Sequence, residues 1–145
     1  MKFDVQWGYN NVCIQPGDEW KVAFKMNHGL FEPLVMFFGL TNSPMTFQVM
    51  MNKIFTEEIQ EGHIVIYLDD ILIFSDNLDE HRTLVVQVLQ KLWLHKLYLK
   101  PKKCEFEKEM VNYLGMIVGR GKVWIEEKKI EAIRNWNAPS KKKDL

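Results

Sequence analysis

The chain has 145 residues, of which 47% are hydrophobic and 26% are charged. These values are ordinary for one globular domain, and they exclude disordered and collagen-like classes. Its 19 basic and 19 acidic residues leave no formal net charge, so any nucleic-acid-binding surface must be a local patch. Cys13 and Cys104 stand apart from other thiols and histidines, which argues against a disulfide scaffold or structural zinc and favours a reducing compartment. No apolar run reaches the roughly 18 residues of a membrane span, so we expect no membrane partner.

Short strands and tight turns are expected in the first part of the chain. Apolar and polar residues alternate there, or apolar residues gather in short runs, as strands require. The predicted strands cover residues 2–6, 12–15, 20–25 and 30–31. Pro16-Gly17-Asp18 predicts a turn before the third strand, and Asn27-His28-Gly29 predicts a hairpin turn before the fourth.

A helix is expected from Ser43 to Gly62. Ser43 suits the N-cap, Pro44 suits the first helical position, and Gly62 ends the pattern. Apolar residues recur between them at helical spacing, and they are interpreted as core packing rather than as a cofactor site. This apolar row consists of Phe47, Met50, Met51, Ile54, Phe55 and Ile59.

Residues 64–75 contain two apolar arms around Asp69 and Asp70, which predicts a hairpin with the aspartates at its tip. Tight hairpin turns favour Asn-Gly or Asp-Gly, so Asp-Asp is a poor turn sequence. Two carboxylates about 4 Å apart also repel by roughly 4 kcal/mol at an effective dielectric near ~20. A divalent cation removes that repulsion, because Mg²⁺ prefers oxygen ligands. A solvated polar turn is the alternative interpretation.

Asp4 lies between Phe3 and Val5 in an apolar strand, where a carboxylate is unfavourable unless it has a partner or an edge position. Two strands side by side would bring Asp4 to the turn at Asp69 and Asp70. Three carboxylates meeting there would suit a two-metal site for phosphoryl transfer. We therefore expect Asp4 within about 10 Å of the turn, because metals in such sites lie roughly 3.5–4 Å apart.

The second half of the chain is expected to hold two helices and several short strands. A helix over residues 79–96 carries two apolar rows for packing, Leu84, Val88 and Leu92 in one and Val85, Leu89 and Trp93 in the other. Beyond a basic break at Pro101-Lys102-Lys103, the predicted strands cover residues 104–106, 111–118 and 122–125, a helix covers 126–136, and a frayed tail covers 141–145. This order predicts an α+β fold, in which an antiparallel sheet carries helices on one face.

Five segments of the chain, in the same order as in the family, resemble the reverse transcriptases of gypsy-type LTR retrotransposons. The catalytic box is Tyr67-Leu68-Asp69-Asp70, and the other four segments are residues 3–9, 38–48, 103–106 and 113–115. The resemblance spans nearly the whole chain. It implies a polymerase palm-type antiparallel sheet with part of the fingers over residues 1–126. Residues 127–145 would form a helix and tail leading toward a thumb and connection outside this segment.

The resemblance implies an RNA-directed DNA polymerase that joins dNTPs to a primer 3′-hydroxyl. Two Mg²⁺ ions, for which Mn²⁺ can substitute, would be held by Asp4, Asp69 and Asp70 and by Val5. The nucleotide would contact Tyr9, Phe38 and Gly39, with Tyr9 as a steric gate against the 2′-hydroxyl. Template and primer would contact Asn42, Ser43, Pro44, Gln48, Tyr67, Leu68, Leu114 and Gly115. Lys103 would donate a proton to pyrophosphate, with Lys100 and Lys102 as competing candidates.

Structural interpretations of the same residues stay open. Tyr9 also suits a core position, Gln48 suits a solvated or sheet-contacting position, and Leu114-Gly115 suits an ordinary hairpin. The lysines between residues 96 and 108 suit either a phosphate backbone or plain solvation. The histidines lack ligand spacing and are interpreted as structural or solvated, at positions 28, 63, 81 and 95.

The expected partners are an RNA or DNA template with its primer, dNTPs, and the rest of a pol polyprotein with thumb, connection and ribonuclease H. The chain itself is expected to be a segment of that polyprotein. It would act inside the cell, in the cytoplasm and in virus-like particles, with nuclear access for the element. Two alternatives are a catalytically inactive truncated remnant that keeps the fold and nucleic-acid binding, and another two-metal enzyme such as a nucleotide cyclase. The loop at residues 38–44 argues against the cyclase.

Overall fold

The computed structural model describes residues 1–136 and divides the chain into two compact units, Met1–Phe106 and Glu107–Leu145. The predicted division of the chain at residue 126 stays a prediction. The assignment of these segments to palm, fingers and thumb stays a prediction. The predicted tail at residues 141–145 lies outside the described residues.

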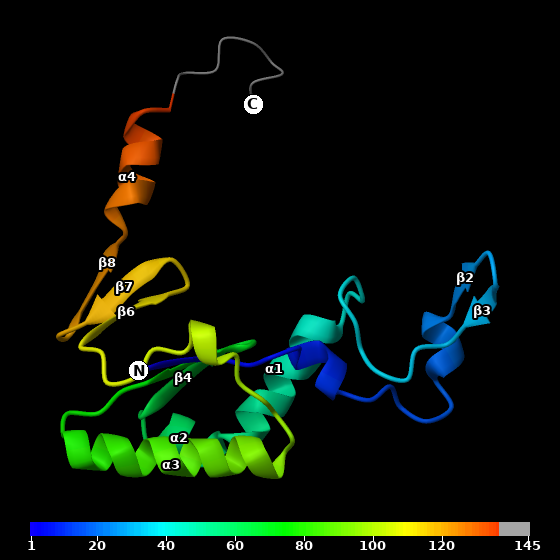
Figure 1. The fold of residues 1–145 in the computed structure, drawn as a ribbon, viewed down its shortest axis with the longest axis horizontal. Coiled ribbons are helices and arrows are strands. Elements are labelled where there is room, and N and C mark those ends of the chain that lie inside the picture. The colour runs from blue at the N-terminus through cyan, green and yellow to red at the C-terminus, as the bar shows by residue number, and fades with distance from the viewer. Residues whose placement is uncertain (137–145) are drawn as a thin grey trace. The chain divides into compact units, whose positions relative to one another are not determined.

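A three-stranded antiparallel sheet forms the centre of the first unit (Figure 1). Its strand order is β1 (Lys2–Asp4), β5 (Asp70–Ile73) and β4 (Ile64–Tyr67). In this register Asp70 lies opposite Asp4 on one side and opposite Tyr67 on the other. The central strand of the sheet thus begins at one of the predicted catalytic residues.

The two faces of this sheet differ in polarity. Residues that lie opposite each other on antiparallel strands share a face, and successive residues of one strand alternate between faces. One face carries the buried apolar side chains Phe3, Ile64, Ile71 and Ile73. The other face carries Lys2, Asp4, Val65, Tyr67 and Asp70, together with the buried Leu72. The apolar face packs into the core, so the polar face is left for chemistry.

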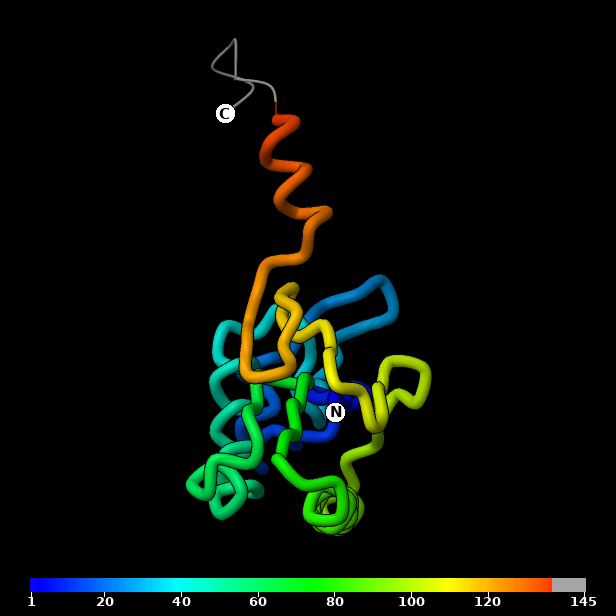
Figure 2. The backbone as a smooth tube through the Cα atoms, turned by 90° about the vertical axis from the view of Figure 1, so that its left-hand side faces the viewer, coloured from blue at the N-terminus to red at the C-terminus, as the bar shows by residue number. Residues whose placement is uncertain are grey.

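Three helices complete the first unit, namely α1 (Ser43–Ile54), α2 (Thr56–Gln60) and α3 (Leu78–Leu94). In Figure 2, α3 is viewed along its axis. The helices share one hydrophobic cluster with the apolar face of the sheet, and their buried contributions include Phe47, Met51, Phe55, Leu84, Val88 and Leu92. The predicted α+β fold with an antiparallel sheet and helices on one face is confirmed.

The predicted helix over residues 43–62 is divided at Phe55, where α1 ends and α2 follows. The Phe55 side chain is fully buried, and the Thr56 hydroxyl donates hydrogen bonds to the carbonyls of Asn52 and Lys53, at 2.9 and 3.1 Å. These bonds satisfy carbonyl groups at the end of α1.

The predicted N-cap at Ser43 is wrong by one residue, because Asn42 occupies that position without a side-chain capping bond. Ser43 is instead buried, and its hydroxyl donates to the carbonyl of Phe37 at 3.4 Å. A buried hydroxyl needs such a partner, which here ties the helix to the preceding loop.

The predicted strands at residues 12–15 and 20–25 form only in part. Short 3-10 helices occupy Gly8–Asn11 (η1) and Glu19–Val22 (η2), and Cys13 makes a single bridge to Val35. The hairpin of β2 (Phe24–Met26) and β3 (Gly29–Phe31) is confirmed. Outside it, some backbone groups bond locally, as in the 3.0 Å bond from Lys21 N–H to the carbonyl of Asp18, and others bond across the segment, as in the 2.9 Å bond from Ile14 N–H to the carbonyl of Leu34.

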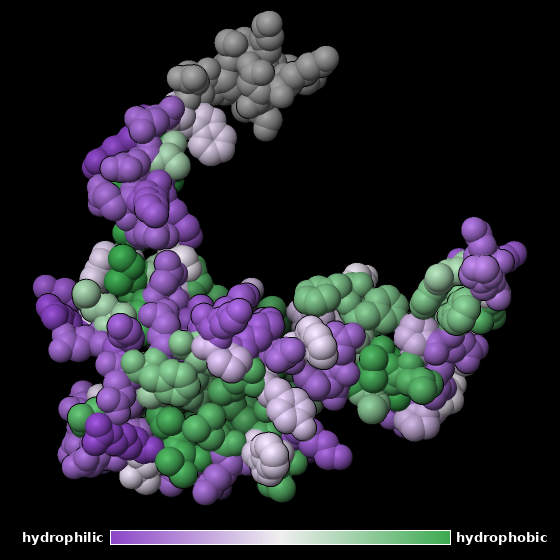
Figure 3. Space-filling view, viewed as in Figure 1, coloured by the Kyte–Doolittle hydropathy of each residue, from purple (hydrophilic) through white to green (hydrophobic). Residues whose placement is uncertain are grey.

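The second apolar row predicted on α3 does not pack as expected. Val85 is buried, but Leu89 is 38% exposed and Trp93 is 76% exposed. The buried stripe therefore follows Leu84, Val88 and Leu92 and leaves the neighbouring face in solvent. Figure 3 shows hydrophobic side chains gathered along α3 and again around the β2–β3 hairpin.

The second unit holds an antiparallel meander of β6 (Met110–Tyr113), β7 (Met116–Gly119) and β8 (Lys122–Ile125), followed by α4 (Glu127–Arg134). The strand predicted at 111–118 is thus two strands, joined by Leu114 and Gly115 with φ of +51° and +75°. Positive φ at both turn residues is the two-residue hairpin geometry that matches strand twist. The strand predicted at 104–106 is reduced to one bridge, between Glu105 and Lys2.

None of the helices in the described part of the chain has the length and apolar character that a membrane span requires.

Candidate active site

Asp4 and Asp70 lie directly opposite each other on β1 and β5. Such partners have Cα atoms about 4.5–5.5 Å apart and side chains on the same face. The Val5 N–H also donates to the main-chain carbonyl of Asp69 at 2.8 Å, which ties the end of β1 to the β4–β5 turn. The expected closeness of Asp4 to the two adjacent aspartates is therefore confirmed for the backbone.

The β4–β5 turn consists of Leu68 and Asp69, because Tyr67 and Asp70 already pair as strand residues. The prediction that both aspartates occupy the tip is corrected for Asp70, which begins β5. Leu68 has a φ of +53°, which for a side chain other than glycine is unfavourable by roughly 1–2 kcal/mol. The turn needs support from its neighbours to keep this conformation.

Gln48 of α1 supplies that support. Its Oε1 accepts a hydrogen bond from the Leu68 N–H at 2.7 Å, and its Nε2 donates to the carbonyl of Ile66 at 3.2 Å and to Asn52 Oδ1 at 2.8 Å. The side chain thus holds the backbone on both sides of Tyr67. This is the sheet-contacting position that the sequence left open, whereas a template contact of Gln48 stays a prediction.

Asp4 is 6% exposed and lies between two lysines that follow α3. Lys100 Nζ is 3.0 Å from Asp4 Oδ1, and Lys103 Nζ is 3.3 Å from Oδ2. On the same face of the sheet, Lys2 Nζ is 3.1 Å from Asp70 Oδ1. Ammonium groups therefore neutralise the two paired aspartates.

Within residues 1–136, no three His, Cys, Asp or Glu side chains are grouped as a metal site would require. Asp4 Oδ1 is nevertheless buried and has no hydrogen bond within that part of the chain, although the Lys100 ammonium is close enough for an ion pair. An unsatisfied buried carboxylate oxygen is a suitable ligand for a hard divalent cation. The donor set of Asp4, Asp69 and Asp70 fits such an ion.

Tyr9 and Phe38, two predicted nucleotide contacts, are brought together by the fold. Their ring centroids are 4.9 Å apart, and Tyr9 also packs edge-on against Phe47 at 5.7 Å. Burial raises the pKa of the Tyr9 phenol, and the nearby Asp69 carboxylate and Tyr67 raise it further. The phenol therefore stays neutral near physiological pH and lies within electrostatic reach of the β4–β5 turn.

The other predicted residues are dispersed. Phe38 is exposed, and Gly39 has a φ of +105° with no described atom near the place of a side chain. Asn42 and Pro44 are exposed at the start of α1. Leu114 and Gly115 belong to the turn of the second unit, and their primer contact stays a prediction.

One feature of the site was missed from the sequence, and a second was left open there as an alternative. Lys2 was given no role, although strand alternation places it on the same face as Asp4 and therefore near Asp70. The hold of Gln48 on the turn depends on a helix packing across the sheet, which no local pattern indicates.

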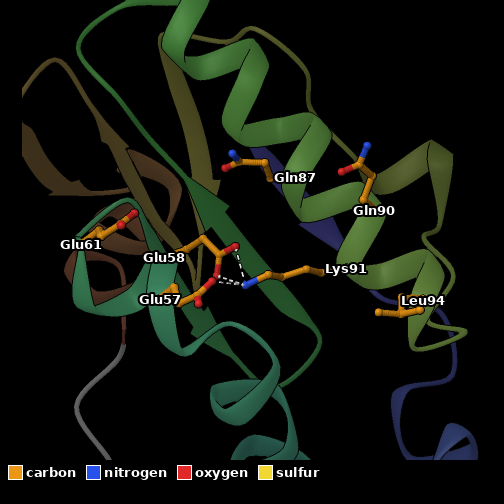
Figure 4. Close-up of a pocket in the computed structure, with 7 residues that line it drawn as sticks. All are labelled: Glu57, Glu58, Glu61, Gln87, Gln90, Lys91 and Leu94. Carbon is orange, nitrogen blue, oxygen red and sulfur yellow. Dashed lines mark hydrogen bonds and ion pairs between the residues drawn. The ribbon is translucent and has the colours of Figure 1, made fainter.

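A cavity of about 390 Å³ lies between α2 and α3, apart from these residues (Figure 4). It is lined by Glu57, Glu58, Glu61, Gln87, Gln90, Lys91 and Leu94. Lys91 Nζ binds Glu58 at 2.9 Å and Glu57 at 3.1 Å, so the charged groups of the cavity pair with one another. The cavity contains none of the predicted site residues.

Residues 1–118 match the family described as reverse transcriptase (RNA-dependent DNA polymerase). The chain belongs to the reverse transcriptase family. Among its relatives, the transposon Tf2-3 polyprotein of Schizosaccharomyces pombe is 36% identical over 144 residues, and Tf2-7 is 35% identical. Each match covers 99% of this chain and 11% of the polyprotein, so the chain spans about a tenth of these relatives.

Solved structures share the fold of this reverse transcriptase chain. The foamy viral protease-reverse transcriptase in complex with RNA/DNA hybrid has a TM-score of 0.83 at 21% identity, covering 99% of this chain and 19% of that one. The dRH form in complex with double-stranded DNA has a TM-score of 0.88 at 20% identity, covering 99% and 25%. The resemblance to retrotransposon enzymes is confirmed. Reverse transcriptases generally use divalent metal ions. In this chain the candidate ligands are the side chains of Asp4, Asp69 and Asp70, which we call the carboxylate corner.

Proposed function

We propose that this chain is the catalytic palm segment, with part of the fingers, of an RNA-directed DNA polymerase. The observation that carries the proposal is the pairing of Asp4 with Asp70, beside a turn that contains Asp69. Family membership supports the polymerase chemistry, and the buried, unsatisfied Oδ1 of Asp4 supports a cation at this corner.

Asp4, Asp69 and Asp70, with the main chain of Val5, would hold two Mg²⁺ ions, for which Mn²⁺ can substitute. When bound, the ions supply activation of the primer 3′-hydroxyl and neutralisation of the leaving pyrophosphate. Gln48 fixes the turn that carries Asp69, and Val5 fixes the turn to β1. The chain thereby fixes the backbone that carries the ligands before substrate arrives, and preorganisation contributes strongly to catalysis in such sites.

Tyr9 and Phe38 would form the wall against the sugar of the incoming dNTP. Their ring contact keeps Tyr9 in place, so that its phenol excludes a 2′-hydroxyl by size. Lys103, more than half exposed beside Asp4, would hold the proton that the pyrophosphate takes up, and Lys100 is the closer competitor for that role. Lys102 makes no ion pair with Asp4 in the described part of the chain, so it is the weaker candidate.

The partners that follow from this proposal are an RNA or DNA template with primer, dNTPs, and the remaining polyprotein with its thumb, connection and ribonuclease H. Asn42, Pro44 and Tyr67 are exposed and available for template or primer. The parent protein would act inside the cell, in cytoplasmic virus-like particles, with nuclear access for its DNA product.

Primer extension on an RNA template by the parent-length polymerase tests this function. We expect Asp4→Asn, Asp69→Asn and Asp70→Asn each to lower the rate at least about a hundredfold, because each removes charge where the metal ions bind. Asp79→Asn, at a carboxylate of α3 that is 91% exposed, is the matched control and should keep the wild-type rate. Unchanged synthesis by the three site variants would reject the assignment. Tight binding of primer-template without synthesis by the wild type would identify an inactive remnant.

A further inference from the structure

Asp4 is a buried carboxylate that two lysine ammonium groups contact from one side. We propose that Lys100 is a built-in counter-ion, which occupies Asp4 in the metal-free chain and must leave Oδ1 before a divalent cation binds there. This inference rests on the proposed function, because it takes Asp4 as a metal ligand.

The backbone holds both lysines close to Asp4. The Lys100 N–H donates to the main-chain carbonyl of Asp4 at 2.9 Å, so Lys100 lies directly beside β1. Lys103 ends the 3-10 helix η3 (Pro101–Lys103), and its N–H donates to the carbonyl of Lys100 at 2.9 Å. A short turn therefore presents two ammonium groups to one carboxylate.

The two lysines differ in what they contact. Lys100 Nζ is 3.0 Å from Oδ1, the buried oxygen that lacks a hydrogen bond, and the Lys100 side chain is 32% exposed. Lys103 is 62% exposed and reaches Oδ2 at 3.3 Å. Lys100 thus neutralises Oδ1, and its ammonium is the charged partner that a cation at this oxygen would have to replace. A long lysine stem that is already partly exposed can return its ammonium to water.

A divalent cation and an ammonium cannot share Oδ1, because both are cations and would lie within a few ångströms of each other. Metal binding at Asp4 must therefore displace Lys100. The consequence is a lowered affinity for metal, since each binding event breaks an existing ion pair. Removal of the Lys100 charge should raise that affinity.

The inference is tested by titrating the full chain with Mn²⁺. Binding is measured as the decrease of the electron paramagnetic resonance signal of free Mn²⁺. We expect Lys100→Gln to bind Mn²⁺ at least about fivefold more tightly than the wild type, the effect of one unit charge about 4 Å away even under strong screening. Lys102→Gln removes the same charge from the same turn but not from Asp4, and its affinity should stay within about twofold. Equal affinities of the two variants would overturn the proposal.

Asp4→Asn separates this inference from the proposed function. If Asp4→Asn abolishes binding and Lys100→Gln leaves it unchanged, the counter-ion role fails and the metal site stands. If Asp4→Asn leaves Mn²⁺ binding intact, the metal site itself fails, and the counter-ion role fails with it.

A measurement on the wild-type chain avoids dependence on the folding of Lys100→Gln. Nitrogen-detected NMR of lysine ammonium groups measures the exchange of their protons with water. We expect the Lys100 ammonium to exchange slowly without metal and to exchange faster in saturating Mg²⁺. The Lys102 ammonium, which is exposed, should not change. A Lys100 signal unaffected by saturating Mg²⁺ would contradict the proposal.

Discussion

At the scale of single residues, the turn that carries Asp69 depends on one side chain. Leu68 adopts a positive φ, and both ends of the Gln48 amide bind the main chain around it. Removal of that amide leaves the Leu68 N–H and the Ile66 carbonyl without their partner. The positive φ of Leu68 then loses the contact that stabilises it.

Gln48→Ala should therefore lower the free energy of unfolding by about 1–2 kcal/mol, the value of two modest hydrogen bonds partly replaced by water. Urea denaturation of the chain measures this. Thr46→Ala, at an exposed position of the same helix, is the control and should stay within about 0.5 kcal/mol of wild type. Equal stabilities of the two variants would show that the amide does not hold the turn.

Tyr9 carries the second prediction at this scale. Tyr9→Ala in the parent-length polymerase should raise incorporation of ribonucleotides relative to deoxynucleotides at least about tenfold, because it removes the ring that excludes the 2′-hydroxyl. Tyr9→Phe keeps the ring and its contact with Phe38, so it should keep the wild-type preference. Single-nucleotide insertion kinetics measure the ratio. If both variants lose the preference for deoxynucleotides, the phenol hydroxyl of Tyr9 is responsible and not the size of its ring.

At the scale of secondary-structure elements, one ion pair joins α2 to α3. Glu58 is buried, and the Lys91 side chain, 28% exposed, binds it at 2.9 Å (Figure 4). The hydrogen bond that Lys91 donates to Glu58 raises the pKa of Lys91, burial lowers it, and a hydrogen bond donated to Glu57 raises it further. The pair therefore stabilises the chain while Lys91 is charged.

Lys91→Met should lower the free energy of unfolding by about 2 kcal/mol, less than the roughly 3–5 kcal/mol of a fully buried pair because Lys91 is partly exposed. Glu57→Gln, which alters the exposed partner of the same lysine, should change it by less than about 0.5 kcal/mol. Urea denaturation measures both. A loss in Lys91→Met no larger than in Glu57→Gln would show that the buried pair adds nothing.

The same pair predicts a pH dependence. The folded-state pKa of Lys91 is raised above its ordinary value of 10.5, so its contribution is fully present below that value. It should be lost as the pH rises through the folded pKa. Wild type should therefore lose stability relative to Lys91→Met only at strongly alkaline pH. A difference between wild type and Lys91→Met that persists unchanged through strongly alkaline pH would assign the effect to another group.

Sequence patterns predicted strands from their local alternation, and they failed where the exposure of a side chain depends on distant packing. The alternation around Asp4 and the two arms around Asp69 gave β1, β4 and β5, and with them the carboxylate corner. Trp93 shows the limit, because helical spacing cannot tell which side of α3 faces the sheet. The contacts of Lys100 with Asp4 likewise join segments far apart in the chain.

At the scale of the whole molecule, the two units differ in how much apolar surface they bury. The first unit holds the hydrophobic cluster of sheet and helices. In the described part of the second unit, only Val111 and Tyr113 are buried apolar residues, and every residue of β8 is exposed. Local stability follows buried apolar contact, so the second unit should open more readily.

Amide hydrogen exchange should show this difference. Protection in β4 and β5 should exceed protection in β8 by at least about a hundredfold, because opening the central sheet requires disruption of the core. Equal protection in the two sheets would show that the chain unfolds as one cooperative unit.

The central claim is that Asp4 and the turn at Asp69 and Asp70 share divalent cations. Anomalous diffraction from crystals of the parent-length enzyme with Mn²⁺, primer-template and dNTP tests it most directly. We predict a manganese peak within about 2.2 Å of a carboxylate oxygen of Asp4 and of at least one oxygen of Asp69 or Asp70. Manganese peaks confined to other carboxylates, with Asp4 still paired to Lys100, would contradict it.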